Sequence, residues 1–271
     1  MLQRLKLPDE LDGNVWQYAD LAAANRQHRH AELELNIVTQ GTGTYLLGNK
    51  QYRIQRGHLL WLFPAQEHVL MEQSPDFAMW IAVFKRRAIR RTAVDPGTRV
   101  LLHTSFQDEA CRRLAPKDLQ QFEDLFVELA TASAEPGLLN AGLHYALMHA
   151  WKCFQRSAGV SVRAVHPAVE RAVRLIKYKG ADLSLGELAK QCGLSDSRLS
   201  RLFKEQTGST VVEFRNRQRI ERFWQLRSDS PERTLLQAAL DAGFGSYPQF
   251  HRVFREVTGC APRDYQRRQV L

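Results

Sequence analysis

The sequence predicts a two-domain α+β protein: an N-terminal β-barrel or jelly roll followed by two helices, and a C-terminal all-α domain. In the second domain, two helix-turn-helix units are joined by a long helix. Three observations support this prediction. Short runs rich in Val, Ile, Leu and aromatic residues fill residues 28–84. A pattern of apolar and glycine positions within residues 183–268 occurs twice. Nearly all of the net charge of +9 belongs to residues 161–271.

Length and charge limit the possible classes of protein. A chain of 271 residues is long enough for two domains that each bury a core. Residues 161–271 carry 20 Lys and Arg against 12 Asp and Glu, whereas residues 1–160 carry 18 against 17. A basic half of this kind can neutralise phosphates, although a solvated basic surface gives the same count.

Cysteine spacing and hydropathy exclude other classes. The four cysteines, Cys111, Cys153, Cys192 and Cys260, form no C-x-x-C pair, which argues against a zinc module and a disulfide scaffold. No apolar run approaches the ~20 residues of a membrane span, and no basic-then-apolar signal segment is present at the start. We therefore expect a cytoplasmic protein with no membrane partner.

The N-terminal half has the pattern of a β-rich domain. Residues 1–26 are weakly patterned and are expected to form an arm or an edge strand. Six strands then follow, separated by Gly, Pro and Ser, with Gly48-Asn49 as a hairpin turn. The expected strands are 33–40, 43–47, 50–54, 58–64, 67–72 and 77–84, with a possible extra strand at 99–103. Strands at this spacing indicate a sandwich or a barrel.

The segment after these strands is expected to be helical. A basic cluster at residues 85–91 could contact an anion, but a charge run is more often a solvated face. Apolar stripes predict helices at 117–132 and 138–154, and residues 157–163 are expected to be a linker. We therefore divide the chain into a β domain at 1–110, a helical segment at 111–160 and a C-terminal domain at 161–271.

The repeat defines the C-terminal domain. Leu199 and Phe203 recur 51 positions later as Phe250 and Phe254, whereas Gly193 recurs 50 positions later as Gly243. The second copy therefore has one extra residue at its turn. In each copy a short amphipathic helix ends at the glycine, and a serine is placed to cap the helix that follows. This is the pattern of a helix-turn-helix unit built twice.

The second helix of each copy presents polar groups opposite its apolar stripe. In the first copy these are Ser197, Arg201 and Lys204, with Ser200 beside them. In the second copy Pro248, Arg252 and Arg255 occupy this face, with His251 beside them. Arginine can bond guanine O6 and N7 with two hydrogen bonds, and such a helix fits the major groove of DNA.

The segment between the copies predicts a rigid spacer. Residues 211–228 lack Pro and Gly, and a helix of this length rises roughly 27 Å. Successive major-groove faces on one side of B-DNA lie about 34 Å apart, so both reading helices could engage one duplex. Arg215, Arg217 and Arg219 of the spacer are expected to meet phosphates. The alternative is an all-helical domain without a nucleic-acid partner.

These residues carry a resemblance to a known family. Residues 163–271, and above all Gly243-Phe244, Phe250, Arg252, Phe254, Arg255, Gly259, Pro262 and Tyr265, resemble the DNA-binding domain of AraC/XylS-type transcription regulators. The resemblance implies base contacts from Ser197, Ser200 and Arg201, and from Tyr247, Pro248, Gln249, His251 and Arg252. Phe223-Trp224 depart from the family pattern, which has a small residue in the spacer. With Lys204 and Arg255 at phosphates, the expected DNA-binding set is Ser197, Ser200, Arg201, Lys204, Tyr247, Gln249, His251, Arg252 and Arg255.

The β domain carries a second resemblance. His28-x-His30-x-x-x-Glu34, with Gly41, Gly57, Pro64 and His68, is similar to the two motifs of a cupin jelly roll, although Gln66 stands where glycine is usual. The resemblance implies a possible divalent metal at His28, His30, Glu34 and His68. Alternatively, these side chains line an effector pocket without metal. Trp16, Tyr45, Trp61 and Trp80 could line such a pocket or simply fill the core.

Together the resemblances imply an effector-controlled transcription regulator. The expected partners are promoter DNA, a small molecule, RNA polymerase if the protein activates, and a second copy. The helices at 117–132 and 138–154 either bind this second copy, which we favour, or pack on their own barrel; no cofactor is required. The rival class is a metal-dependent cupin enzyme, a dioxygenase or isomerase, with a helical accessory domain. A third possibility is a constitutive regulator whose barrel only supports dimerisation.

Overall fold

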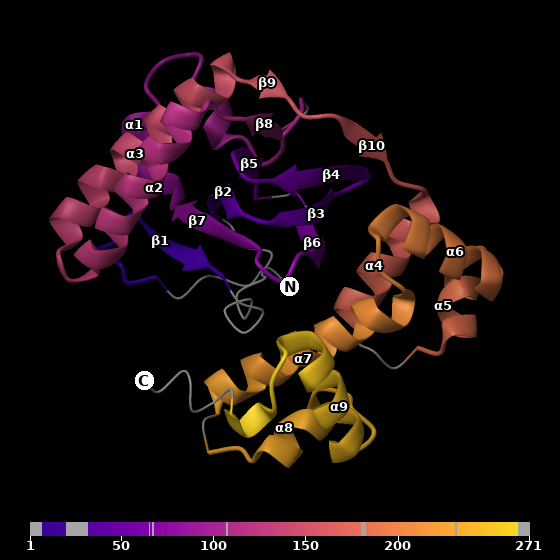
Figure 1. Ribbon diagram of the computed structural model, residues 1–271. Coiled ribbons are helices and arrows are strands. Elements are labelled where there is room, and N and C mark those ends of the chain that lie inside the picture. Colours follow the sequence, from indigo (N-terminus) through magenta and orange to yellow (C-terminus); the bar gives the residue numbers. More distant parts are fainter. Residues whose placement is uncertain are drawn as a thin grey trace. The chain divides into compact units, whose positions relative to one another are not determined.

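The computed structural model describes residues 7–19, 32–64, 66, 68–106, 108–179, 183–230 and 232–264. The described chain forms two compact units that divide between Ala164 and Val165 (Figure 1). In the described residues, no helix is both long and apolar enough to cross a membrane.

The first unit contains two antiparallel sheets. One has the order β1 (Gly13–Tyr18), β7 (Ala78–Phe84), β2 (Leu33–Gln40), β5 (His58–Leu62), β8 (Cys111–Arg113) and β9 (Ala158–Gly159). The other has the order β10 (Val162–Ala164), β4 (Lys50–Gln55), β3 (Thr42–Leu47) and β6 (His68–Gln73). The six expected strands are confirmed, and β1 is an edge strand as expected. Gly48 takes a φ of +53° in the predicted hairpin turn.

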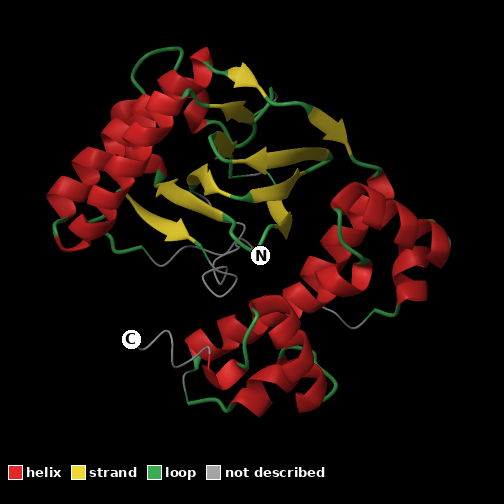
Figure 2. Ribbon diagram, viewed as in Figure 1, coloured by secondary structure: helices red, strands yellow, loops and turns green. Residues whose placement is uncertain are grey.

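Helices cover one face of the six-stranded sheet (Figure 2). They are α1 (Arg86–Thr92), α2 (Pro116–Thr131) and α3 (Pro136–Arg156), with short 3-10 helices η1 (Arg99–Leu102) and η2 (Ala132–Ala134). The predicted helices at 117–132 and 138–154 are confirmed. The extra strand predicted at 99–103 is wrong: the Leu101 amide donates to the Thr98 carbonyl at 3.0 Å, which closes a 3-10 turn.

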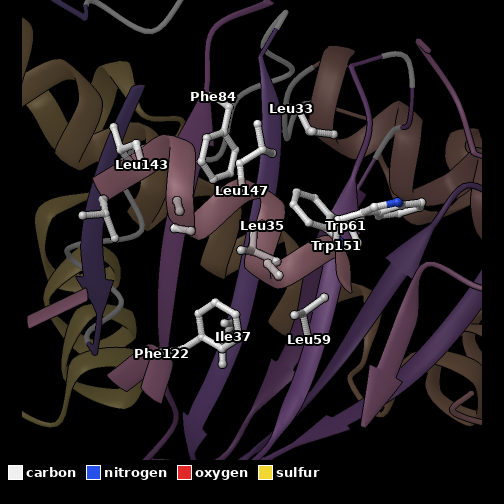
Figure 3. Packing of buried hydrophobic residues seen from close by; sticks show 14 of the residues in the cluster. Leu33, Leu35, Ile37, Leu59, Trp61, Phe84, Phe122, Leu143, Leu147 and Trp151 are labelled. Atoms are coloured by element: carbon white, nitrogen blue, oxygen red, sulfur yellow. The ribbon is translucent and has the colours of Figure 1, made fainter. Parts of the chain in front are cut away.

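Strand β2 is buried on both of its faces. Leu33, Leu35 and Ile37 point toward α2 and α3 and share one core with Phe122 and Leu147 (Figure 3). The alternate residues point the other way, and the Asn36 amide donates to the Tyr45 hydroxyl of the second sheet at 3.1 Å. The layers are therefore helices, six-stranded sheet and four-stranded sheet. Helices α2 and α3 complete the β domain and are not a separate segment, because they share its core.

The basic cluster at 85–91 forms α1, which fixes the start of the first strand. Asp12 is buried, and Arg87 Nε donates to its carboxylate at 2.7 Å. His144 Nε2 and Arg91 lie 2.9 and 3.1 Å from the same carboxylate. Burial alone would raise the Asp12 pKa, but these partners outweigh it and lower the pKa below its ordinary value. Two of the five basic residues in the cluster thus serve an internal ion pair network.

Residues 157–163, expected to be a linker, belong to the sheets of the first unit. β9 pairs with β8, where Arg112 lies opposite Gly159, and β10 pairs with β4, where Val162 lies opposite Tyr52. The linker prediction is therefore wrong, because this segment is bound at the edges of both sheets. The connection between the units is at Ala164 and Val165.

The second unit is all-α. Its helices are α4 (Pro167–Lys179), α5 (Leu185–Gln191), α6 (Asp196–Thr207), α7 (Val211–Asp229), α8 (Leu235–Asp241) and α9 (Tyr247–Thr258). The repeat is confirmed: α6 and α9 both have 12 residues and start 51 positions apart, whereas α5 and α8 start 50 apart. Helix α7 is the predicted spacer.

Candidate nucleic-acid interface and effector site

Local sequence signals set the ends of the first reading helix, α6. The Ser195 hydroxyl accepts from the Arg198 amide at the N-terminus, and Gly208 takes a φ of +79° at the C-terminus. Leu199 and Phe203 are fully buried, and the Phe203 ring lies 5.7 Å from that of Phe214 on α7. The back of α6 is thereby fixed to the core.

The opposite face of α6 is open to solvent. Ser197, Arg201 and Lys204 are exposed and Ser200 is half-buried. The Arg201 side chain keeps 71% of its surface accessible. The four residues expected to meet DNA therefore lie together on one free helix face.

The second reading helix, α9, has the same serine cap, glycine end and buried apolar face as α6, but it packs on a larger core. Ser246 caps its N-terminus, and Gly259 ends it with a φ of +76°. Phe250, Val253 and Phe254 are buried, and the Phe250 ring lies 4.6 Å from that of Phe223 on α7. The bulky Phe223-Trp224 pair of the spacer is thus core, packed against α9.

The exposed face of α9 is formed by the predicted residues. Arg252, Arg255 and Pro248 are exposed, whereas Tyr247, Gln249 and His251 are half-buried. The Gln249 side-chain oxygen accepts from the Gly245 amide at 2.9 Å, so this residue also supports the turn. Sequence reasoning missed that role, because the spacing Ser246-x-x-Gln249 indicates a contact with the Ser246 amide, one residue after the amide that Gln249 contacts.

Two acidic residues on these faces were also missed. Glu205 lies 3.9 Å from Arg201, and Glu256 lies 3.8 Å from Arg252. Each glutamate follows its arginine by four residues, which places both on the same side of the helix. This i,i+4 spacing was the available signal.

The spacer arginines have partners inside the unit. Arg215 donates to the Ser184 carbonyl at 3.4 Å, and the guanidinium of Arg219 lies 5.9 Å from the ring centre of Phe244. Arg217 is half-buried. Arg215 and Arg219 thus connect α7 to the first and the second helix-turn-helix, respectively, a role that their expected phosphate contacts did not include.

In the first unit, the four predicted pocket aromatics lie on two different faces of the sheet. Trp61 and Trp80 belong to the core beneath the helices, where their rings lie 6.1 Å from Trp151 and 5.9 Å from Phe126. On β1, Val15 points into that core, so Trp16 points to the other side, which Tyr45 also faces. The four residues therefore do not line one cavity, and Trp61 and Trp80 have the core-filling role.

Buried polar side chains lie between the two sheets. Asn36 is fully buried, and its side-chain oxygen has no hydrogen-bond partner among the described residues. Burial and the nearby Glu34 carboxylate raise the pKa of Tyr45 well above its ordinary value, with a smaller effect from Tyr18. The Tyr18 hydroxyl donates to Gln73 at 2.7 Å. A buried group of this composition can orient a small polar molecule.

The proposed metal ligands are only partly within the described residues. His28 and His30 lie outside them. Glu34 is buried between the sheets, and the His68 ring lies 6.3 Å from the Tyr45 ring, with Nδ1 3.2 Å from the Gln66 carbonyl. Across the described ranges, no three His, Cys, Asp or Glu side chains gather in a group that could hold a metal. Two of the four ligands thus border the same space, and the metal stays a proposal.

Two family models match the chain, one in each unit. A helix-turn-helix domain model matches residues 188–268. A model of the AraC-like ligand binding domain matches residues 16–80. The first match covers both reading helices, and the second covers most of both sheets.

Two of the curated relatives align with most of the chain, and another aligns with less than a third of it. The arabinose operon regulatory protein of Salmonella typhimurium is 26% identical over 243 residues, 86% of this chain and 82% of the relative. That of Escherichia coli is 25% identical over 86% of this chain and 79% of its own. An uncharacterised helix-turn-helix regulator of Staphylococcus aureus is 38% identical over 85 residues, 31% of this chain and 11% of its own.

Solved structures with similar chains are more distant. ToxT from Vibrio cholerae aligns with a TM-score of 0.41 at 15% identity, covering 95% of this chain and 97% of its own. The AraC-like activator CuxR aligns with a TM-score of 0.37 at 12% identity, covering 82% of this chain and 79% of its own.

Proposed function

The chain is an AraC-type transcription regulator, and from this premise we propose that α6 and α9 read promoter DNA while a small molecule between the N-terminal sheets controls the reading. The observation that carries the proposal is the repeat. Arg201 and Arg252 are both about 70% exposed and lie 51 residues apart, at equivalent positions of two helices whose backs are fixed to a core.

The proposed roles follow from the chemistry of each side chain. Arg201 and Arg252 each bond a guanine, because the guanidinium matches O6 and N7. Lys204 and Arg255, one turn or less beyond, meet phosphates. The remaining contacts come from Ser197, Ser200, Tyr247, Gln249 and His251.

A binding-site selection followed by titration tests this proposal. Selection from random duplexes should return two conserved blocks about one helical turn apart. Arg201→Ala should remove about 1–3 kcal/mol of the binding free energy that discriminates one base pair of that operator. Lys204→Ala, the matched loss of one positive charge, should weaken binding to all DNA sequences alike. It should also reduce by about 1 the slope of log affinity against log salt concentration. Unchanged operator binding by Arg201→Ala would show that its assigned role is wrong.

We also propose that the effector binds between the sheets, beside Asn36 and Tyr45. The support is the Asn36 oxygen, which has no partner among the described residues, and the buried Tyr45 hydroxyl, both of which lie between the sheets. A divalent metal at His28, His30, Glu34 and His68 is part of the same proposal, since Glu34 and His68 border this space. In the alternative, the same four residues contact the effector without a metal.

Dimerisation through α2 and α3 is a further proposal. Both helices pack on their own sheet, yet Val127, Leu138 and Tyr145 stay about half exposed on them. A second copy bound there would cover these side chains. We place the regulator in the cytoplasm, with RNA polymerase as partner if it activates.

A further inference from the structure

Both reading arginines have an acidic partner at the same relative position. Arg201 Nε lies 3.9 Å from Glu205, and a terminal nitrogen of Arg252 lies 3.8 Å from Glu256. Both glutamate side chains are 59% exposed. The two pairs are 51 residues apart, as are the helices themselves, so the two copies repeat the pair as well as the core.

Helix stability does not explain these glutamates. Each lies two residues before the end of its helix, in the last turn, where the helix dipole disfavours a negative charge. The neighbouring Lys204 and Arg255 have the sign that the dipole favours there. Nor does packing explain them, since both side chains are mostly in solvent. An exposed i,i+4 ion pair also adds little to stability.

Their position on the DNA-facing side suggests a different role. A carboxylate on this face repels phosphates, which dominate binding to non-specific DNA. The nearest carboxylate oxygen lies 3.9 Å from Nε of Arg201 and 3.8 Å from a terminal nitrogen of Arg252, beyond hydrogen-bonding distance in both pairs, so the terminal nitrogens stay available for the two acceptors of a guanine. The carboxylate can thus disfavour phosphate contacts while keeping the guanidinium in position for a base.

We propose that Glu205 and Glu256 are positioning residues that set the ratio of operator binding to non-specific binding. They act through Arg201 and Arg252, and the inference therefore rests on the proposed function of those arginines. The consequence is that removing either negative charge makes the regulator bind DNA more tightly but less selectively.

The test compares three isosteric variants of the full chain. Glu205→Gln and Glu256→Gln remove one charge from a reading helix. Glu170→Gln removes one from a different i,i+4 pair on α4, in which the half-buried Glu170 precedes Arg174 at 3.0 Å, and is the control for loss of one paired negative charge. Dissociation constants are measured for the selected operator, for single-base-pair variants of it and for a random duplex, at two salt concentrations.

Each reading-helix variant should bind the random duplex about two- to fivefold more tightly, with no equal gain at the operator. Its specificity ratio should fall, whereas that of Glu170→Gln should stay at the wild-type value. In the Arg201→Ala background, Glu205→Gln should leave discrimination at the affected base pair unchanged, because the glutamate acts through the arginine.

The outcomes separate this inference from the proposed function. If Arg201→Ala loses discrimination at one base pair but Glu205→Gln keeps the wild-type ratio, the positioning role is wrong and DNA reading stands. If the ratio of operator binding to non-specific binding falls in all three variants, the change comes from net charge alone, and the inference is overturned. If Arg201→Ala changes nothing, both the base-reading assignment and this inference fail.

Discussion

At the scale of single residues, the buried carboxyl of Glu221 has an energetic consequence. Glu221 lies on the buried side of α7, where Gln218 donates to it at 2.9 Å. Burial raises its pKa to about 7, although Lys177 and Arg217 partly oppose this effect. Between about pH 4.5 and pH 7, the folded protein therefore holds a proton at Glu221 that the unfolded chain, with a carboxyl pKa near 4.5, has released.

The stability of the second unit should consequently depend on pH. Because the pKa is raised on folding, this group favours the folded state below about pH 4.5, and the benefit is lost as pH rises through about 7. Glu221→Gln should raise the free energy of unfolding by about 1–3 kcal/mol at pH 8, with a smaller gain at pH 5.5.

Urea unfolding of the full chain at both pH values measures this difference. Exposed Glu232→Gln is the control for loss of one charge. An equal effect of Glu221→Gln at pH 5.5 and pH 8 would contradict the raised pKa.

Single side chains also show what sequence could and could not predict. The polar face of each reading helix followed from the 100° rotation per residue, whereas Tyr247 packs against the core of the second unit, away from the face that carries Arg252. Trp61 and Trp80 could not be placed in this way. Both faces of a central strand are buried, so alternation does not tell which face meets the helices and which meets the second sheet.

At the scale of elements, predictions succeeded where a local signal fixes the end of the element. Serine caps gave the starts of α6 and α9, and glycines gave the ends of the short helices before them. Helix α1 was missed because its sequence, RRAIRRT, buries only Ala88 and Ile89 and so lacks an apolar stripe. The 3-10 helix η1 was mistaken for a strand, since four residues are too few to show either period.

Helices α2 and α3 provide a test of the proposed dimer. Val127 is 55% exposed on α2, and the exposed Tyr145 ring stacks 5.4 Å from His149 on α3. Val127→Glu should raise the dimer dissociation constant at least about tenfold, because a charge would be buried at the contact.

Sedimentation velocity across a dilution series measures the effect. Val94→Glu, at an exposed valine outside both helices, is the matched control. A dimer that Val127→Glu leaves intact would place the contact on another surface.

At the scale of the whole molecule, the effector should stabilise the first unit by mass action. A ligand at 100 times its dissociation constant adds about 2.7 kcal/mol to the free energy of unfolding, which a thermal-shift screen of polar metabolites detects. A compound that binds beside Asn36 should raise the melting temperature of the wild-type protein but not that of the Asn36→Leu variant. The variant loses the hydrogen bond to the Tyr45 hydroxyl, but its leucine also replaces a buried oxygen that has no partner among the described residues, so we expect it to stay folded.

Gln55→Leu, at an exposed position of β4, is the control for the same change elsewhere in the unit. If the shift of every binder survives Asn36→Leu, the space between the sheets is not the effector site.

The two-domain plan was predictable from the change of periodicity and from the repeat, but the exact point of division was not. Strands β9 and β10 have two and three residues and carry no periodic signal. Their pairing depends on sheet edges supplied by residues more than 40 positions earlier, which no local pattern records.

This pairing matters for separating the protein into its domains. A sensor fragment that stops at Arg156, where the last helix ends, leaves the free edges of β8 and β4 uncovered, and bare edges recruit strands from other molecules. A fragment that continues to Ala164 keeps both edges closed. Residues 157–164, which include the segment expected to be a linker, therefore protect two sheet edges, and we expect the shorter fragment to aggregate more readily than the longer one.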